Sequence, residues 1–250
     1  MSAFPQSLKT WRQTRRFSRL DLALEADVSA RHISFLETGR ARPSQEMVAR
    51  LGEALRLPLD ARNQLLSHAG FAARYPGRNW QTADMAPIRR AVDHMLTGHA
   101  PYPALALDRR WIIKGMNAQA RALYGLLGVG DDDSLVDLMV SDSLPPLIEN
   151  WPAVAHHAAQ RLRTESMAQG GVAELDAAAA HLSRVARPLD RGLEPVVPTI
   201  LNTGTVRLSM FATIAQFGTP EDVTLDDLKI ELYFPADEPT ALALRQMAAG

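Results

Sequence analysis

The chain has 250 residues, of which 46% are hydrophobic and 22% are charged, and it contains no cysteine. This composition is typical of a globular protein, and without cysteine the chain has no disulfides, thiolate metal sites or cysteine nucleophiles. The formal net charge of −1 conceals an asymmetry, because residues 1–80 carry a balance of +6 and residues 81–250 one of −7. Such a contrast indicates two domains, of which the basic one suits a polyanion.

Residues 5–70 predict five short helices. Ser18 and Asp21 have the spacing of a capping box, and Ser29 begins a helix that Gly39 ends. The tight break between these two helices resembles the turn of a helix-turn-helix unit.

The helix expected over residues 29–38 has two contrasting faces. At about 100° per residue, Ile33 and Leu36 share one apolar side. The opposite side carries Arg31, Ser34, Phe35 and Thr38. An α-helix fits the major groove of B-DNA, where arginine can bond a guanine edge and an apolar group can contact a thymine methyl. We therefore expect Arg31 and Phe35 to read bases.

Further basic and hydroxyl side chains flank this helix. Ser18 and Arg19 begin the preceding helix with backbone N–H groups that could meet phosphate, and Arg40 and Arg42 follow in the loop. The predicted DNA-binding residues are Ser18, Arg19, Ser29, Ala30, Arg31, Ser34, Phe35, Thr38, Arg40 and Arg42.

The run FSRLDLALEADVSARHISFLETGRARPSQEMVARLGEALRLP resembles the Cro/repressor-type helix-turn-helix domain of the XRE family. The match is carried by Leu20-x-x-Ala23, Val28-Ser29, Ile33, Leu36-Glu37-x-Gly39 and Pro43. The resemblance implies a five-helix domain with Ala30, Arg31, Ser34 and Phe35 at base-reading positions, although Phe35 stands where the family often has a polar residue. It also implies an ion pair between Glu37 and Arg12.

A linker over residues 73–86 separates this domain, residues 1–72, from a second one over residues 87–250. In the second, residues 104–107 and 111–116 predict a β-hairpin, and Asn117 can cap a helix. A helical stretch over 135–187 follows. The β-like segments 195–201, 205–217 and 228–234 and a short terminal helix complete the chain. The expected fold class is α+β, with one antiparallel sheet and helices on one side of it.

The strand expected over residues 205–217 alternates between two faces. Its apolar face is suited to a core or a cavity and carries Val206, Leu208, Met210, Ala212 and Ile214. The other face is mixed, and its residues Phe211 and Phe217 could meet another subunit.

The second domain resembles the PAS-like ligand-binding domain of MmyB-like regulators. The resemblance is carried by YPALALDRRWIIKGMNAQARALYG, the segment Ile148–Trp151 and FATIAQFGTPEDVTLDDLKIELYFPAD. It implies a small hydrophobic, fatty-acyl-like ligand between sheet and helices. The residues expected to line the pocket are Leu105, Leu107, Tyr124, Trp151, Met210, Ala212 and Ile214.

No catalytic or metal-binding pattern is found, so we expect neither an enzyme nor a cofactor. His156 and His157 point about 100° apart on a helix, and residues 131–133 lack the spacing of a calcium loop. The sequence predicts a cytoplasmic, ligand-responsive transcription regulator that binds a palindromic double-stranded DNA operator as a homodimer, away from membranes. Two alternatives are an antitoxin-like interaction module and a redox sensor holding haem or flavin.

Overall fold

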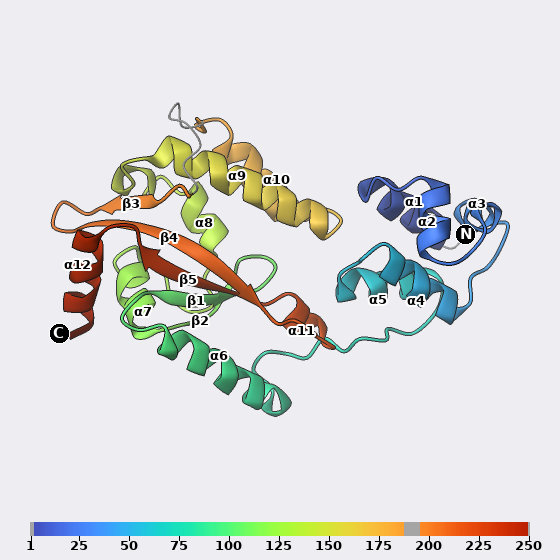
Figure 1. Cartoon of the computed structure of the whole chain (residues 1–250), viewed down its shortest axis with the longest axis horizontal. Helices are drawn as coiled ribbons and strands as arrows, with labels where there is room; N and C mark the ends of the chain where they lie inside the picture. The colour runs from blue at the N-terminus through green and yellow to red at the C-terminus, as the bar shows by residue number, and fades with distance from the viewer. Residues whose placement is uncertain (1–2, 188–195, 250) are drawn as a thin grey trace. The chain divides into compact units, whose positions relative to one another are not determined.

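The structure, a computed structural model, describes residues 3–187 and 196–249. The chain divides into two compact units, the first built from residues 1–78, 166–171 and 219–226 and the second from the remainder. We call helices α1–α5 the helical domain, and the five-stranded sheet with its covering helices the sheet domain (Figure 1). The expected α+β class is confirmed.

The helical domain contains the five expected helices. They are α1 (Phe4–Thr14), α2 (Arg19–Glu25), α3 (Ala30–Glu37), α4 (Gln45–Ala54) and α5 (Leu59–His68). Ser18, Ser29 and Ser44 accept backbone N–H groups at the starts of α2, α3 and α4, and Ser18 completes the capping box with Asp21. Gly39, with φ +71°, ends α3 in the left-handed region that favours glycine.

One apolar core joins these five helices. Its fully buried side chains include Leu8, Leu22, Ile33, Leu36 and Leu65. Of the two residues named in the motif Leu20-x-x-Ala23, Ala23 is buried and Leu20 is exposed. Helix α2 packs on the core through Leu22 and Ala23, and Leu24 also faces solvent.

The sheet domain is built on one antiparallel sheet with the strand order β2-β1-β5-β4-β3. The strands are β1 (Ala104–Leu107), β2 (Ile113–Met116), β3 (Thr199–Asn202), β4 (Arg207–Gln216) and β5 (Lys229–Pro235). The hairpin of β1 and β2 and the three returning strands agree with the sequence patterns. The expected strand start at Pro195 lies outside the described residues, whereas Pro198 precedes the observed start.

Helices cover both faces of the sheet, not one as the sequence analysis expected. One face packs on α6 (Ala86–Gly98) through Val92, Leu96 and Ile230. Phe217 joins this layer, and Phe211 stacks on Phe234 of the neighbouring strand with ring centroids 5.6 Å apart. Both phenylalanines are half-buried by these contacts within the domain, and their contact with another subunit stays a prediction.

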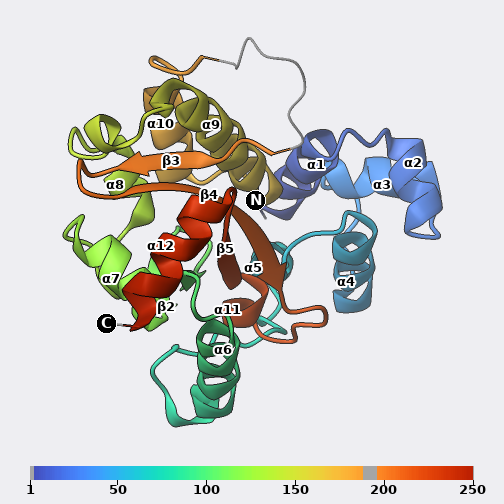
Figure 2. The same ribbon diagram turned by 60° about the vertical axis from the view of Figure 1, so that its left-hand side comes forward.

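The other face carries the larger core, to which the remaining helices of this domain, labelled in Figures 1 and 2, contribute side chains. They are α7 (Ala118–Gly125), α8 (Leu135–Val140), α9 (Trp151–Ala168), α10 (Ala173–Leu182) and α12 (Glu238–Ala249). The last residues of α9 and the short α11 (Val223–Asp226) are grouped with the first unit.

A single buried amide joins β1, α6 and α7. Asn117 caps α7 by accepting from Ala120 N–H at 2.9 Å and also accepts from Ala104 N–H at 3.0 Å. Its NH₂ group donates to the carbonyls of Leu96 and Tyr102 at 3.1 and 2.8 Å. The side chain thus uses both donors and both acceptor positions of an amide. Among the described residues, no helix is long and apolar enough to cross a membrane.

Candidate nucleic-acid interface and ligand cavity

Helix α3 buries one face and presents the other. Ile33 and Leu36 are fully buried, and Ser29 Oγ accepts from His32 N–H at 3.1 Å to cap the helix. None of the ten residues predicted to bind DNA is buried: Ser18, Arg19, Ser29, Arg31, Thr38, Arg40 and Arg42 are exposed, and Ala30, Ser34 and Phe35 are half-buried. Helix α3, the second helix of the α2–turn–α3 unit, therefore has an outer face that the domain's own residues leave uncovered.

Arg31 and Phe35 form a stacked pair on that outer face. The guanidinium carbon of Arg31 lies 5.2 Å from the centre of the Phe35 ring, which is a cation–π geometry. Because Phe35 packs beneath the arginine and is absent from the domain's core cluster, one turn of helix presents a cation and an apolar ring together. This combination suits a guanine edge next to a thymine methyl.

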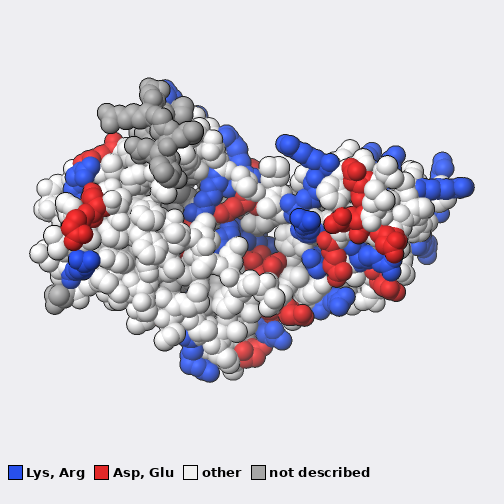
Figure 3. All heavy atoms as spheres, viewed as in Figure 1, with Lys and Arg blue, Asp and Glu red and all other residues white. Residues whose placement is uncertain are grey.

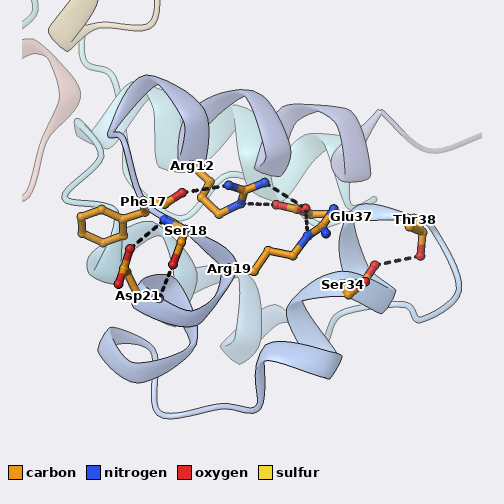
Figure 4. Close-up of polar contacts among 8 residues, drawn as sticks. All are labelled: Arg12, Phe17, Ser18, Arg19, Asp21, Ser34, Glu37 and Thr38. Atoms are coloured by element: carbon orange, nitrogen blue, oxygen red, sulfur yellow. Dashed lines mark hydrogen bonds and ion pairs between the residues drawn. The ribbon is translucent and has the colours of Figure 1, made fainter.

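A buried carboxylate fixes α3 to α1 and α2 (Figure 4). Glu37 accepts from Arg12 Nε at 2.5 Å and Nη2 at 3.2 Å, and from Arg19 Nε at 2.7 Å. Burial disfavours the charged carboxylate, but these hydrogen bonds and charges outweigh it and hold the pKa of Glu37 below its usual value. The structure thus contains the Glu37–Arg12 pair implied by the family resemblance, and it adds Arg19 as a second cation that the sequence did not reveal.

Hydrogen bonds within the domain reduce the donors that Arg19 and Ser18, two of the predicted contact residues, have free for DNA. Arg19 commits its Nε to Glu37, while its side chain remains 45% exposed. The backbone N–H of Ser18 donates to Asp21 at 2.8 Å, so it is not the free phosphate donor expected from the sequence. The hydroxyl of Ser18 only accepts, from Asp21 N–H at 3.1 Å, and therefore keeps its proton for donation.

The hydroxyl of Thr38, unlike that of Ser18, already donates its proton within the protein. Its hydroxyl donates to the carbonyl of Ser34 at 2.8 Å, which leaves it only acceptor capacity toward a ligand (Figure 4). Arg40 and Arg42 form no ion pair within the described part of the chain and are both exposed. On the face drawn in Figure 3, acidic and basic side chains are mixed over the helical domain, so the positive charge forms no continuous patch on that face.

A partly open cavity of about 360 Å³ lies between the sheet and α7, α8 and α9 of the sheet domain. Four of the residues predicted from the sequence line it, namely Tyr124, Trp151, Met210 and Ala212. The other three do not: Leu105 and Leu107 are fully buried in the adjoining core, and Ile214 is 47% exposed. The walls are mostly aliphatic and aromatic, as in many small-molecule sites.

One end of the cavity is polar, which the sequence analysis did not foresee. Arg161 of α9 reaches Glu231 of β5 with Nη2 2.5 Å from Oε1, and it donates to Glu165 through Nε at 2.9 Å. Tyr233 donates to Glu231 at 3.0 Å, and its oxygen lies 2.7 Å from the hydroxyl of Tyr124. Of these residues, Arg161, Glu231, Tyr233 and Tyr124 line the cavity itself.

Next to this polar end, the carboxylate of Glu165 interacts with three donor side chains, one of which is Arg161. Lys229 forms an ion pair with it, and Trp111 Nε1 donates to it at 2.8 Å. Burial opposes its ionisation, but Lys229 and Arg161 lower the pKa of Glu165 below its usual value. Burial likewise opposes the charge on Arg161, yet Glu231 and Glu165 raise its pKa, so the ion pairs are maintained at neutral pH.

Trp111, which lies at this end of the cavity, has an unusual backbone conformation. Its φ of +65° is rare for a bulky residue, and its ring centre lies 4.2 Å from the guanidinium carbon of Arg161. Such strain costs about 1–2 kcal/mol and persists only where surrounding contacts impose it. The signal for these residues was available in β5, where Lys229, Glu231 and Tyr233 alternate onto one face.

Comparison with known families agrees with this division. Residues 88–247 match the family described as the MmyB-like transcription regulator ligand binding domain, and residues 8–61 match the helix-turn-helix family. No curated protein matches the chain. Within residues 3–187 and 196–249, no group of three or more His, Cys, Asp or Glu side chains is placed to hold a metal ion.

Proposed function

The chain belongs to the MmyB-like transcription regulators, DNA-binding proteins with a ligand-binding domain, and we propose that it binds a specific operator through α3 and senses a small hydrophobic ligand in its cavity. The proposed division assigns DNA binding to residues 1–72, a linker to 73–86, and ligand binding and dimerisation to 87–250. We further propose that the protein acts in the cytoplasm and is not an enzyme.

The observation that carries the DNA half of this proposal is the Arg31–Phe35 pair on an uncovered helix face. A helix of this kind reads the major groove through the side chains of its exposed side, and dimers of such domains read two half-sites about 34 Å apart. We therefore propose a homodimer on a palindromic operator, with Arg40 and Arg42 contacting phosphates beside the groove.

The experiment is selection of bound sequences from a random pool of duplex DNA. We expect a palindromic consensus for the full chain. Arg31→Ala should lose preference at one base pair per half-site and about 1–3 kcal/mol of specific binding. Arg42→Ala should weaken all sequences alike, and Arg245→Ala on α12 is a charge-matched control that should change neither. An unaltered consensus for Arg31→Ala would disprove the assignment of the reading face.

The cavity supports the ligand half of the proposal. Its volume and mostly apolar walls suit a compound with a hydrocarbon body. A ligand can alter operator binding only through a difference in its affinity for the DNA-competent and incompetent arrangements, which is typically worth about 1–3 kcal/mol.

Native mass spectrometry of the full chain should show a dimer and any small molecule retained from the cell. Operator titration with the ligand-bound and ligand-stripped protein then measures the coupling. Equal operator affinities would remove the sensing role and leave DNA binding intact.

A further inference from the structure

The polar end of the cavity contains a hydrogen-bond chain with one possible direction. Burial raises the pKa of both Tyr124 and Tyr233, so both phenols keep their protons at neutral pH. Glu231, paired with Arg161, can only accept, so Tyr233 donates its proton to that carboxylate. Tyr124 must then donate to Tyr233 across their 2.7 Å contact. The chain therefore ends in an oxygen of Tyr124 that can accept but not donate.

The charges at this end are already balanced. Arg161 and Lys229 supply two positive charges, and Glu165 and Glu231 supply two negative ones. Arg161 bonds one carboxylate through Nε, approaches the other through Nη2 and has Trp111 against its face. A ligand carboxylate entering here would have to share Arg161, a cation on the cavity wall, with Glu231 and Glu165, and it would also meet an accepting oxygen. Burying a charge without a partner is strongly unfavourable.

The only other ionisable side chain on the cavity wall is His157, among the described residues. It is solvent-exposed, whereas Tyr124, Glu231 and Tyr233 are buried or half-buried. It therefore does not neutralise a group held beside Tyr124.

The volume of the cavity indicates how much of a ligand it can surround. An apolar cavity of about 150 Å³ holds benzene, with its six carbon atoms, so by proportion 360 Å³ holds about 14 non-hydrogen atoms. Leu138, Ile148, Val154 and Met210 offer only apolar contacts along the walls.

We propose that the cavity selects a neutral amphiphile, with an alkyl chain and one hydrogen-bond-donating head such as a hydroxyl or an amide, and rejects the corresponding carboxylate. The head donates to Tyr124, and the alkyl chain fills the apolar remainder. This inference rests on the proposed ligand-binding function and specifies the chemistry of its ligand.

The test uses the full chain and the neutral fluorescent probe 1-aminonaphthalene, which is small enough for the cavity, displaced by decanol, decanamide or decanoate at neutral pH. These competitors share one chain and differ in the head. We expect decanol and decanamide to compete about tenfold or more better than decanoate. Comparable or better competition by decanoate, while the probe still binds, would overturn the headgroup inference and leave the ligand-binding function intact.

Two variants sharpen the result. Glu231→Gln removes one negative charge from the pair with Arg161, so the preference should shift toward decanoate by about tenfold. Glu149→Gln removes an equal charge at an exposed pair with Arg207, outside the cavity wall, and should leave the preference unchanged. An unchanged preference in a folded Glu231→Gln protein would contradict the charge-balance explanation.

A third variant, Tyr124→Phe, tests the hydrogen bond to the ligand head independently of the ion pairs. It deletes the accepting oxygen and should weaken decanol about fivefold, whereas the control Glu149→Gln should leave the decanol affinity unchanged. Unchanged decanol affinity would overturn the role of Tyr124. If the probe and all three competitors fail to bind the wild type, the cavity's ligand-binding function fails together with this inference.

Discussion

Glu37 is the residue on which three helices of the helical domain depend. Its carboxylate has no exposed side-chain surface and serves Arg12 of α1 and Arg19 of α2 at once. Replacing it with glutamine leaves Arg12 buried without a counter-charge. We expect Glu37→Gln to destabilise the helical domain by about 3 kcal/mol, measured by hydrogen exchange of the α1 and α3 amides in the full chain.

The same substitution should show a characteristic pH dependence. Because the pKa of Glu37 is lowered on folding, its stabilisation is present above the ordinary glutamate pKa and is lost as pH falls through the folded value. The difference between wild type and Glu37→Gln should therefore be largest near neutral pH and shrink below about pH 4.3. Glu53→Gln is the control, because Glu53 is 60% exposed and 4.0 Å from Arg62; it should change stability by about 0.5 kcal/mol or less.

Asn117 has a comparable position in the sheet domain. Asn117→Asp keeps the two acceptor contacts, to Ala104 and Ala120 N–H, but loses both donations to the carbonyls of Leu96 and Tyr102. Each buried group left without a partner costs about 1–3 kcal/mol. We expect Asn117→Ala to lower the melting temperature of the sheet domain clearly, and Asn117→Asp to lower it further at neutral pH, because its buried carboxylate would face the carbonyl oxygens of Leu96 and Tyr102. Unchanged melting temperatures for both variants would show that the amide's contacts are not what stabilises this junction.

At the scale of elements, the end of α3 is set by one glycine. Gly39 adopts φ +71°, and a Cβ there would meet only Pro5 Cγ, at 3.8 Å, so conformation and not space disfavours other residues. Gly39→Ala should cost about 1 kcal/mol. Gly98→Ala near the end of α6 has open space and no such φ, and it should cost nothing. Thermal unfolding of the two variants makes the comparison.

Elements with local signals were predictable from the sequence. The serine caps of α2 and α3, the glycine after α3 and the hairpin of β1 and β2 each depend on a few neighbouring residues. Helix α6 was missed because its buried stripe is narrow, with only Val92 and Leu96 fully covered among polar neighbours.

The polar end of the cavity was missed for a different reason. Arg161 and Glu231 lie 70 positions apart in the chain and meet only because α9 crosses the face of β5. The charged residues alternating on β5 signalled an inward-facing polar cluster but not its partners. The apolar wall was easier to infer, since Met210 and Ala212 lie on a strand whose alternation is visible in the sequence.

For the whole molecule, local charge and not net charge should govern DNA binding. The chain carries −1 overall, yet the predicted contacts of the helical domain include exposed arginines on both sides of α3. Six neutralised phosphates would give a slope of log K against log salt of about −5. Anisotropy titrations over a range of KCl concentrations should give this slope, and Arg42→Ala should reduce it by about 1. A slope near zero would exclude phosphate contacts as the main source of affinity.

The shared carboxylate of Glu37 also limits how an effector can silence this protein. A dimeric regulator can lose DNA binding in two ways: its DNA-binding domain is distorted, or the distance between two intact domains changes. Separating α3 from α1 and α2 would leave the buried carboxylate and its arginines without partners, at a cost of about 3–5 kcal/mol. This cost exceeds the coupling free energy of about 1–3 kcal/mol that effectors typically supply. Respacing leaves the carboxylate undisturbed. In the proposed homodimer, the ligand-free and ligand-bound forms should therefore contain identical helical domains and differ only in the distance between them.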